Sequence, residues 1–313
     1  MYLEKVLDYF SDNKSVQIIL VNNNSSCELS SLIEETKTKI HLINSSHNKG
    51  SAWGFKTGIQ YAILQADCAY IWLLDDDNLP EKNVLAILTD TFTLRVLQNQ
   101  NNNFALMPVR SDRKYLKNVA DGQPVHWNFP MKNAFLGFHL FKLHYFLFRK
   151  MFRITTKQMN DIIIPCAPYG GLFFHKNLIQ QIGLPDERFF VYADDFEFTY
   201  RITYNNGSIM LVPGAVVNDL EKTWQIKQKG KILSPNILIV DNNKVYFSTR
   251  NYLYFQKKFL IKSELIFRLN KIIYSGYLSF ISHINGKRAN YKRFRDAVND
   301  GLGGNFDNNK YRL

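Results

Sequence analysis

The stretch IWLLDDDNLPE, residues 71–81, contains the transition that decides the fold. Four apolar residues, 71–74, are followed directly by Asp75, Asp76 and Asp77. A continuous apolar run that ends in polar residues is typical of a buried strand in an α/β sheet, and such sheets bind ligands at the carboxyl ends of their strands. We therefore expect a strand over residues 69–74 and a ligand site at its end.

Apolar runs and amphipathic segments alternate on both sides of this strand. This alternation predicts an α/β fold with a mainly parallel sheet that is covered by helices on both faces. The patterns predict strands over 16–21, 40–43, 104–108, 162–164, 172–174 and 210–212, and helices over 29–36, 52–65, 81–97, 178–182 and 196–203.

The last third of the chain has a helical and basic pattern. We expect a catalytic domain over residues 1–220 and a helical, basic C-terminal extension over 221–313, with a loose boundary within 219–233. The segment 110–157 is rich in aromatic and basic residues and is expected to be a loop that partly folds over a ligand. Its aromatic residues between 135 and 148 fit core packing, and with the interleaved lysines and arginines they also fit contact with a membrane surface.

The composition of the chain limits the kinds of partner that we expect it to bind. The 313 residues include 46% hydrophobic residues, enough for a substantial core, and the formal charge is +12. That charge favours an anionic partner, which can be a nucleotide, a phosphorylated acceptor or an acidic membrane face. The three cysteines show no metal-binding spacing and fit a reducing cytoplasm, and the first residues carry no apolar run like that of a signal peptide.

The acidic turn at residues 75–77 has two interpretations. Carboxylate oxygens are preferred ligands of Mg²⁺ and Mn²⁺, and such a cation can bridge the phosphates of a nucleotide sugar. The other interpretation is a solvated turn. Three adjacent carboxylates repel one another unless a positive charge lies among them, which favours the metal site.

A second acidic pair, Asp194 and Asp195, follows an aromatic run and opens an amphipathic helix. Carboxylates at a helix N-terminus are stabilised by the helix dipole, so a capping role explains the pair. One of them also fits a general base that takes a proton from an acceptor hydroxyl. The residues alone leave both roles open.

In their order along the chain, these segments resemble glycosyltransferase family 2, and in particular its bacterial rhamnosyl- and galactofuranosyltransferases. The matching pieces are ILVNNNSS (19–26), NKGSAWGFKTGIQYA (48–62), WLLDDD (72–77), PYGGLFFHKNLIQQIGLPDERFF (168–190), ADDFEF (193–198), STRNYLYFQKK (248–258) and RFRDAVNDGLGG (293–304). The resemblance implies the fold called GT-A, a Rossmann-like sheet flanked by helices.

The resemblance also implies roles for individual residues. Asp195 is the expected general base, with Asp194 beside it in the catalytic pair. The expected metal ligands are Asp75, Asp77 and Asp219; the donor-binding residues are Asn22, Asn23, Lys49, Asp75 and Asp76; the acceptor-binding residues are Tyr169, Gly170, Glu197 and Trp53. The implied cofactor is Mn²⁺ or Mg²⁺.

Three features depart from the family pattern. The family opens with a strand that ends in TYNR, and this strand is expected to be missing here. Asn22 stands where the family has Asp, which keeps an acceptor oxygen but removes a charge. Asp219 stands where the family commonly has a metal-binding His. A carboxylate can also hold the metal, and a plain surface Asp after a buried strand fits the position equally well.

The function implied is that of an inverting, metal-dependent glycosyltransferase that moves a sugar from a nucleotide diphosphate to a glycan acceptor. The implied setting is the inner face of a bacterial membrane, where a surface polysaccharide such as O-antigen or capsule is built on a lipid-linked acceptor. An inactive nucleotide-sugar-binding protein is the alternative, motivated by the missing strand and by Asn22. Binding of nucleic acid is disfavoured, because the basic residues are dispersed and no known motif is present.

Overall fold

The computed structural model describes residues 2–27, 29–36, 38–65, 67–142, 162–221, 236–239, 243–307 and 311, which form two compact units. Unit 1 holds the described residues of 1–129, 162–190 and 194–221, and unit 2 holds those of 130–142, 191–193 and 236–311. The domain boundary expected after residue 220 stays a prediction, and most of the segment around it lies outside the described residues. The segment 110–157 was expected to be a loop over a ligand. Its part from 143 to 157 lies outside the described residues, whereas its described part contains the helices Lys114–Ala120 and Val125–Asn128 and the turn Leu140–Lys142.

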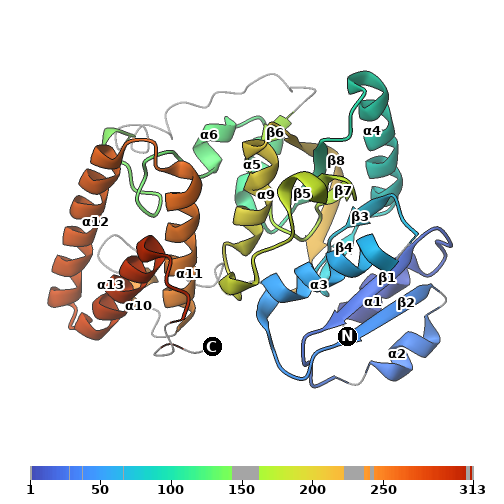
Figure 1. Ribbon diagram of the computed structural model, residues 1–313, viewed down its shortest axis with the longest axis horizontal. Coiled ribbons are helices and arrows are strands. Elements are labelled where there is room, and N and C mark those ends of the chain that lie inside the picture. The colour runs from blue at the N-terminus through green and yellow to red at the C-terminus, as the bar shows by residue number, and fades with distance from the viewer. Residues whose placement is uncertain are drawn as a thin grey trace. The chain divides into compact units, whose positions relative to one another are not determined.

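Unit 1 contains a two-stranded sheet and a six-stranded sheet (Figure 1). In the smaller sheet β1 pairs with β2 in parallel. In the larger sheet the strand order is β3-β7-β5-β8-β4, and β6 also pairs with β8. The bounds of the strands are β1 Gln17–Asn22, β2 Lys39–Asn44, β3 Tyr70–Trp72, β4 Asn78–Pro80, β5 Phe104–Arg110, β6 Ile162–Ile164, β7 Phe173–His175 and β8 Ser208–Asp219.

The α/β class is confirmed, but the prediction of a mainly parallel sheet is wrong for the described strands. In the larger sheet only β5 and β8 pair in parallel, and the other ladders are antiparallel. The reason is that β7 lies antiparallel between β3 and β5. In addition β4, which the sequence did not predict, follows β3 through the acidic turn and pairs antiparallel with β8.

Helices cover the sheets of unit 1, and β5, buried over its whole length, lies at the centre of the core. The side chains of Val84, Leu88 and Phe92 on α4 pack on β5 and β8 because their spacing places them on one face of that helix. The helices of unit 1 are α1 Tyr2–Phe10, α2 Ser30–Glu35, α3 Gly50–Gln65, α4 Val84–Asn99, α5 Lys114–Ala120, α6 Val125–Asn128, α8 Leu178–Ile182, η2 Glu187–Phe189 and α9 Asp194–Tyr204.

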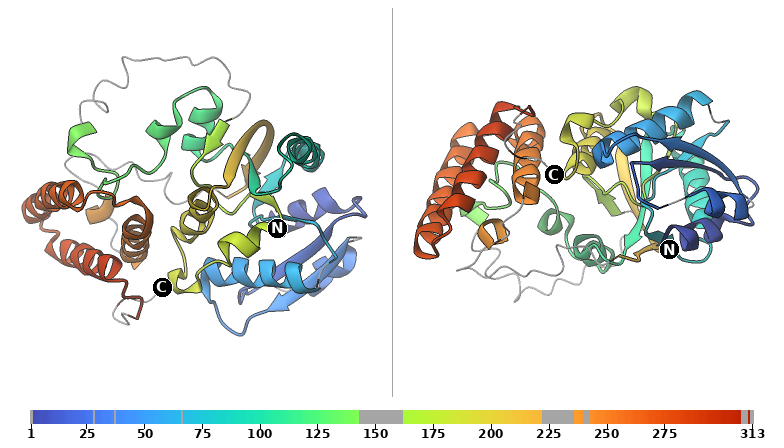
Figure 2. Two further views of the ribbon diagram at one scale, coloured as in Figure 1. Left: turned by 45° about the horizontal axis from the view of Figure 1, so that its top comes forward. Right: turned by 90° about the horizontal axis from the view of Figure 1, so that it is seen from below.

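Unit 2 is helical in its described part, as the C-terminal pattern predicted (Figure 2). Helix α13 packs against both α11 and α12 around an apolar cluster that includes Phe135, Phe267 and Phe294. The elements are η1 Leu140–Lys142, α10 Asn236–Ile239, α11 Asn243–Phe255, the π-helical turn η4 Gln256–Leu260, α12 Glu264–Ile284 and α13 Arg288–Gly303. None of the described helices combines the length and apolarity needed to cross a membrane.

Candidate active site

The acidic turn at residues 75–77 joins β3 to β4 and is fixed to the end of β8. The buried Asn78 accepts a hydrogen bond at Oδ1 from the backbone N–H of Asp75, with 3.1 Å between the atoms. The N–H of Leu220 donates to the carbonyl of Asp77 at 2.9 Å, and β4 pairs Asn78 with Asp219. The strand pairing therefore brings Asp219 to the acidic turn.

Arg110, at the end of β5, connects this turn to two other segments, although its side chain is fully buried. Its guanidinium donates to Asn78 Oδ1 at 2.8 Å and to the carbonyl of Gly170 at 3.0 Å. It also forms ion pairs with Asp112 at 3.0 Å and with Asp219 at 3.1 Å. Because Arg has five donors in a fixed plane, one side chain sets the relative positions of all four partners.

The three expected metal ligands do not form a ready-made site. Among the described residues, no three His, Cys, Asp or Glu side chains are grouped so as to hold a metal ion. The physical reason is that Asp219 pairs with Arg110, while Asp77 accepts a hydrogen bond from the amide of Asn78 at 2.8 Å. The assignment of Asp75, Asp77 and Asp219 as metal ligands therefore stays a prediction.

The residues at the turn nevertheless suit a hard divalent cation. Burial, a hydrogen bond with Asp219 and the charges of Asp219, Asp75 and Asp76 raise the pKa of Asp77 to about 8. Burial also raises the pKa of Asp75. A cation would relieve this concentration of negative charge, and Mg²⁺ commonly binds through one or two carboxylates together with substrate phosphates. Asp75 and Asp77 fit this mode of binding, and Asp76 is exposed beside them.

Asp194 and Asp195 begin α9 on the other side of the candidate site. Asp194 is buried, and its Oδ2 accepts a hydrogen bond from the hydroxyl of Ser51 on α3 at 3.0 Å. Asp195 is half-buried, and its Oδ1 accepts from the N–H of Phe196 at 2.7 Å. Burial raises the pKa of Asp195 to about 6, while burial and the charge of Asp195 raise that of Asp194 to about 8. A half-buried carboxylate with a pKa near neutral suits a general base.

The turn directly before Asp194 has a strained backbone. Phe190, Tyr192 and Ala193 all have positive φ angles of 60° to 70°, which non-glycine residues rarely adopt. Within unit 2, the buried Asn251 donates to the carbonyls of Val191 and Tyr192, at 2.7 and 3.0 Å. Such outliers persist when neighbouring contacts fix them, and they concentrate at functional sites.

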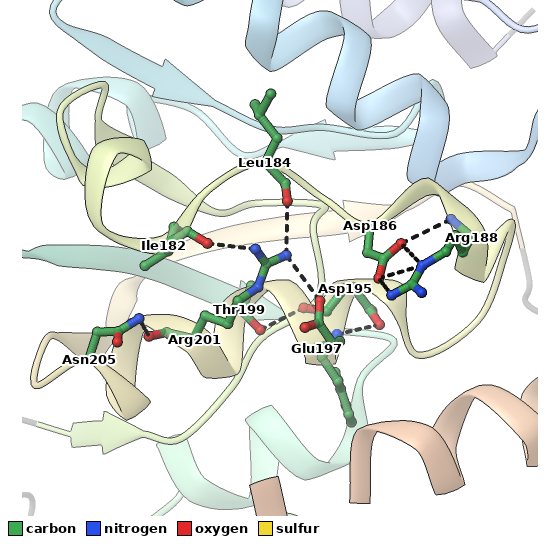
Figure 3. Close-up of polar contacts among 10 residues, drawn as sticks. Ile182, Leu184, Asp186, Arg188, Asp195, Glu197, Thr199, Arg201 and Asn205 are labelled. Atoms are coloured by element: carbon green, nitrogen blue, oxygen red, sulfur yellow. Dashed lines mark hydrogen bonds and ion pairs between the residues drawn. The ribbon is translucent and has the colours of Figure 1, made fainter. Parts of the chain in front are cut away.

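The opposite side of α9 is anchored by Arg201 (Figure 3). Its guanidinium donates to the carbonyls of Ile182 and Leu184 and pairs with Glu197 at 3.0 Å. The side chain of Glu197 is only 1% exposed. The ion pair stabilises the buried charge of Glu197 inside the fold, and its expected contact with the acceptor stays a prediction.

Tyr169 and Gly170 lie between the two groups of carboxylates. A Cβ on Gly170 would lie 1.9 Å from Asn78 Oδ1 and 2.8 Å from Asp75 Oδ2, so only glycine fits. Tyr169 is buried, and its ring stacks on Phe55 with 4.2 Å between the ring centroids. The expected packing of this ring on a sugar stays a prediction. Its hydroxyl has no hydrogen-bond partner among the described residues.

The remaining expected donor residues form a separate cluster at the end of β1. The amide of Asn22 donates to Asn44 at 2.9 Å, and its carbonyl oxygen accepts from the N–H of Ser25 at 2.8 Å. Asn23 accepts from the N–H of Lys49 at 2.8 Å, so both asparagine side chains shape the turn. The Lys49 ammonium lies 4.5 Å from the centroid of the Trp53 ring, which brings an expected donor residue and an expected acceptor residue together.

Electrostatic interactions link the two groups of carboxylates. The charge of Asp75 contributes to the raised pKa values of both Asp194 and Asp195. Arg113 has the opposite effect on one carboxylate of each group. Its positive charge lowers the pKa values of Asp75 and Asp195, although burial, the larger effect, raises both. Neither Arg113 nor Arg110 was predicted from the sequence as a site residue. The feature that could have identified them is a pair of arginines just after a predicted buried strand.

A comparison with family models agrees with this geometry. The model described as Glycosyl transferase family 2 matches residues 2–96, which include the cluster at the end of β1 and the acidic turn. The match covers the first part of the chain, which is therefore similar to glycosyltransferase family 2 over these residues. The resemblance seen in the sequence is thereby confirmed for this part of the chain.

A curated protein similar to this chain is Galactofuranosyltransferase GlfT1 from Mycolicibacterium smegmatis. The two are 25% identical over 194 residues, which cover 61% of this chain and 57% of that protein. The chain thus matches little more than half the length of the relative.

Solved structures similar to this chain include two transferases recorded with Mn²⁺. One is GalNAc-T7 with UDP, GalNAc and Mn²⁺, at 14% identity and a TM-score of 0.49, covering 86% of this chain and 51% of the other. The second is the mannosyltransferase PcManGT from Pyrobaculum calidifontis with GDP-Man and Mn²⁺, at 13% identity and a TM-score of 0.47, covering 99% and 84%. A third is S. aureus TarS, residues 1–349, at 12% identity and a TM-score of 0.43, covering 97% and 88%.

Proposed function

We propose that this protein is an inverting, metal-dependent glycosyltransferase that moves a sugar from a nucleotide diphosphate to a glycan acceptor. One observation carries the proposal. The acidic turn that suits a divalent cation and the carboxylate pair that suits a general base interact electrostatically across Tyr169 and Gly170 in a single unit. Sugar transfer with inversion needs both a stabilised diphosphate leaving group and a base for the acceptor hydroxyl.

The donor side is assigned to the cluster at the end of β1 and to the acidic turn. Asn22, Asn23 and Lys49 lie where the nucleotide is expected, and the Lys49 ammonium supplies positive charge for phosphate. Asp75 and Asp77 are the residues proposed to hold Mn²⁺ or Mg²⁺. Such a cation, when bound, offsets the charge that develops on the departing diphosphate.

The acceptor side is assigned to Asp195. Its carboxylate takes the proton of the acceptor hydroxyl, and the oxygen forms a bond to the anomeric carbon on the face opposite the diphosphate. The bond from the anomeric carbon to the diphosphate oxygen breaks, and the configuration at that carbon inverts. Asp194 precedes the base in the chain, and its carboxylate accepts a hydrogen bond from the hydroxyl of Ser51.

The donor sugar, the pathway and the cellular location are proposed from similarity to other proteins. Because the relative GlfT1 is described as a galactofuranosyltransferase, a galactofuranosyl donor is the first to test, with a rhamnosyl donor next. We place the enzyme in the synthesis of a bacterial surface polysaccharide, such as O-antigen or capsule, on a lipid-linked acceptor. The reaction would take place in the cytoplasm, with peripheral contact to the inner face of the membrane.

A screen of nucleotide sugars with Mn²⁺ tests the proposal. Purified protein is assayed for binding and slow hydrolysis of UDP-galactofuranose, dTDP-rhamnose, UDP-galactose and UDP-N-acetylglucosamine. We expect one donor to stand out and Asp77→Ala to abolish the metal-dependent signal, while Asp90→Ala on the exposed side of α4 leaves it unchanged. Failure of every donor to bind would overturn the proposal.

An inactive nucleotide-sugar-binding protein is the second candidate, favoured by one observation. Asp219, one of the three expected metal ligands, forms a buried ion pair with Arg110. This candidate predicts that a donor binds with the same affinity with or without Mn²⁺ and that no sugar is transferred or hydrolysed.

A further inference from the structure

Helix α12 in unit 2 exposes a stripe of large apolar side chains. Leu265, Ile272 and Phe280 are 80%, 69% and 65% exposed. At about 100° per residue, these three positions lie within roughly 80° of one another around the helix axis, together with the exposed Leu269 and with Gly276, which has open space beside it. An exposed apolar stripe of this length on a single helix marks an interaction surface.

The other face of α12 is already used. Its buried residues Phe267, Leu278 and Ile281 point about 180° away from the stripe and pack in the core of unit 2. Figure 1 shows α12 at one edge of the described part of the helical unit. The helix therefore has one apolar face for the fold and a second that the fold does not need.

The chain in and next to α12 is rich in basic residues. Between residues 256 and 290 it has seven lysines and arginines and one acidic residue, Glu264. Lys257, Arg268 and Lys271 line an open hollow of about 480 Å³ whose apolar wall includes Ile272, a member of the stripe. Glu264 also lines this hollow and pairs with Arg268 at 3.0 Å, which leaves the two lysines in excess there. Positive side chains beside an exposed apolar stripe are the pattern of a helix that lies in a membrane interface.

We propose that the stripe of α12 and its basic rim bind an anionic phospholipid bilayer, with the apolar side chains among the acyl chains and a lipid phosphate in the hollow. The charge selects this occupant over a second copy of the chain. Two copies that pair through the same face would bring their basic rims together, whereas a bilayer of anionic lipid attracts every one of these charges. The inference deepens the proposed peripheral membrane contact and rests on it, but does not depend on sugar transfer.

Flotation with lipid vesicles tests the apolar stripe. The whole chain is mixed with vesicles of phosphatidylcholine alone or of phosphatidylcholine with phosphatidylglycerol. We expect binding only to the second kind and a loss of about tenfold or more in Leu265→Ser/Ile272→Ser/Phe280→Ser. The matched control is Leu94→Ser/Leu97→Ser, which removes side chains of comparable exposure (59% and 72%) from α4 in unit 1 and should bind like the wild type.

The basic rim is tested by Arg268→Gln/Lys271→Gln, for which we expect about 30-fold weaker binding to the anionic vesicles. Excess glycerol phosphate should not displace the protein; displacement would mean that the hollow binds free phosphate and would overturn the bilayer assignment.

Sedimentation velocity gives the other decisive outcome. A dimer that the triple serine variant dissociates, without any vesicle binding by the wild type, would assign the stripe to a second copy. Nucleotide-sugar binding measured on the same samples shows separately whether the proposed transferase function holds.

Discussion

The guanidinium of Arg110 and the carboxylate of Asp219 form a buried ion pair, with 3.1 Å between Nη2 and Oδ2 and side-chain exposures of 0% and 3%. Each charge depends on the other, because neither has water to stabilise it. The same arginine donates to Asn78 and Gly170, so the pair lies at the centre of the candidate active site. The pair holds Asp219 beside the acidic turn, where β4 pairs Asn78 with Asp219.

Arg110→Gln should destabilise the protein strongly, by about 3–5 kcal/mol, since it leaves the charge of Asp219 buried without its partner. Urea denaturation measures the change. The control is Arg188→Gln, which breaks the ion pair between Arg188 and Asp186 where the Arg188 side chain is 55% exposed, and should change stability by less than about 1 kcal/mol. Equal effects of the two substitutions would contradict the central role of Arg110.

The sequence predicted the elements around this ion pair but not the pair itself. Apolar runs located β1, β2, β3 and β5, because buried strands of this class require them. The abrupt change to Asp75 likewise located the site. Arg110, in contrast, follows an apolar strand in a position that is typical of a surface charge. In the structure its side chain is fully buried by contacts with residues far away in the chain, which no local pattern reveals.

Two residues expected on the acceptor side have partners inside the fold. Phe55 stacks on Tyr169, and Arg201 pairs with Glu197. The first contact joins residues far apart in the chain, so no local pattern reveals it. The second joins residues four positions apart on α9, and helical spacing in the sequence could have revealed that pair.

Gly170→Ala should impair both stability and donor binding. The added methyl group would lie within 3 Å of Asn78, Arg110 and Asp75, and the first two are buried and fixed by hydrogen bonds. Overpacking of this kind costs about 1–3 kcal/mol. Gly54→Ala on α3 is the control, because its methyl group would meet no atom within 4 Å. Calorimetric titration with the donor and thermal denaturation measure the two effects, and full donor affinity in Gly170→Ala would argue against a site at this position.

Asp195→Asn should reduce turnover by a factor of about 10²–10⁴ while the affinity for the donor stays nearly unchanged, because the amide cannot accept the acceptor's proton. Single-turnover rates and donor titration separate the two quantities. Asp90→Asn on the exposed side of α4 serves as the control and should behave like the wild type. Turnover retained by Asp195→Asn would require a different base.

The pH profile provides an independent check on Asp195. Burial raises its pKa to about 6, and only the deprotonated form accepts a proton. The value of kcat/KM should therefore rise as pH increases through about 6 and level off above it. A profile measured with saturating metal that stays flat from about pH 5 to pH 8 would argue against this carboxylate as the base.

Asp194 should make the stability of the protein depend on pH. Burial and the charge of Asp195 raise its pKa from 3.8 to about 8, so the folded protein holds this proton more tightly than the unfolded chain does. Its contribution to the free energy of unfolding is therefore present at low pH and is lost as pH rises through about 8. Asp194→Asn keeps an oxygen to accept the hydrogen bond of Ser51 but removes the buried charge. We expect the variant to be more stable than the wild type at about pH 9, on the order of 1–3 kcal/mol, and to lose this advantage near pH 5, where the wild-type carboxyl is protonated.

Urea denaturation at the two pH values measures the difference. Ser51→Ala is the contrasting variant, because it removes the hydrogen bond that favours the charged form and should steepen the loss of stability with rising pH. An equal stability difference between Asp194→Asn and the wild type at both pH values would mean that Asp194 is already charged at pH 5.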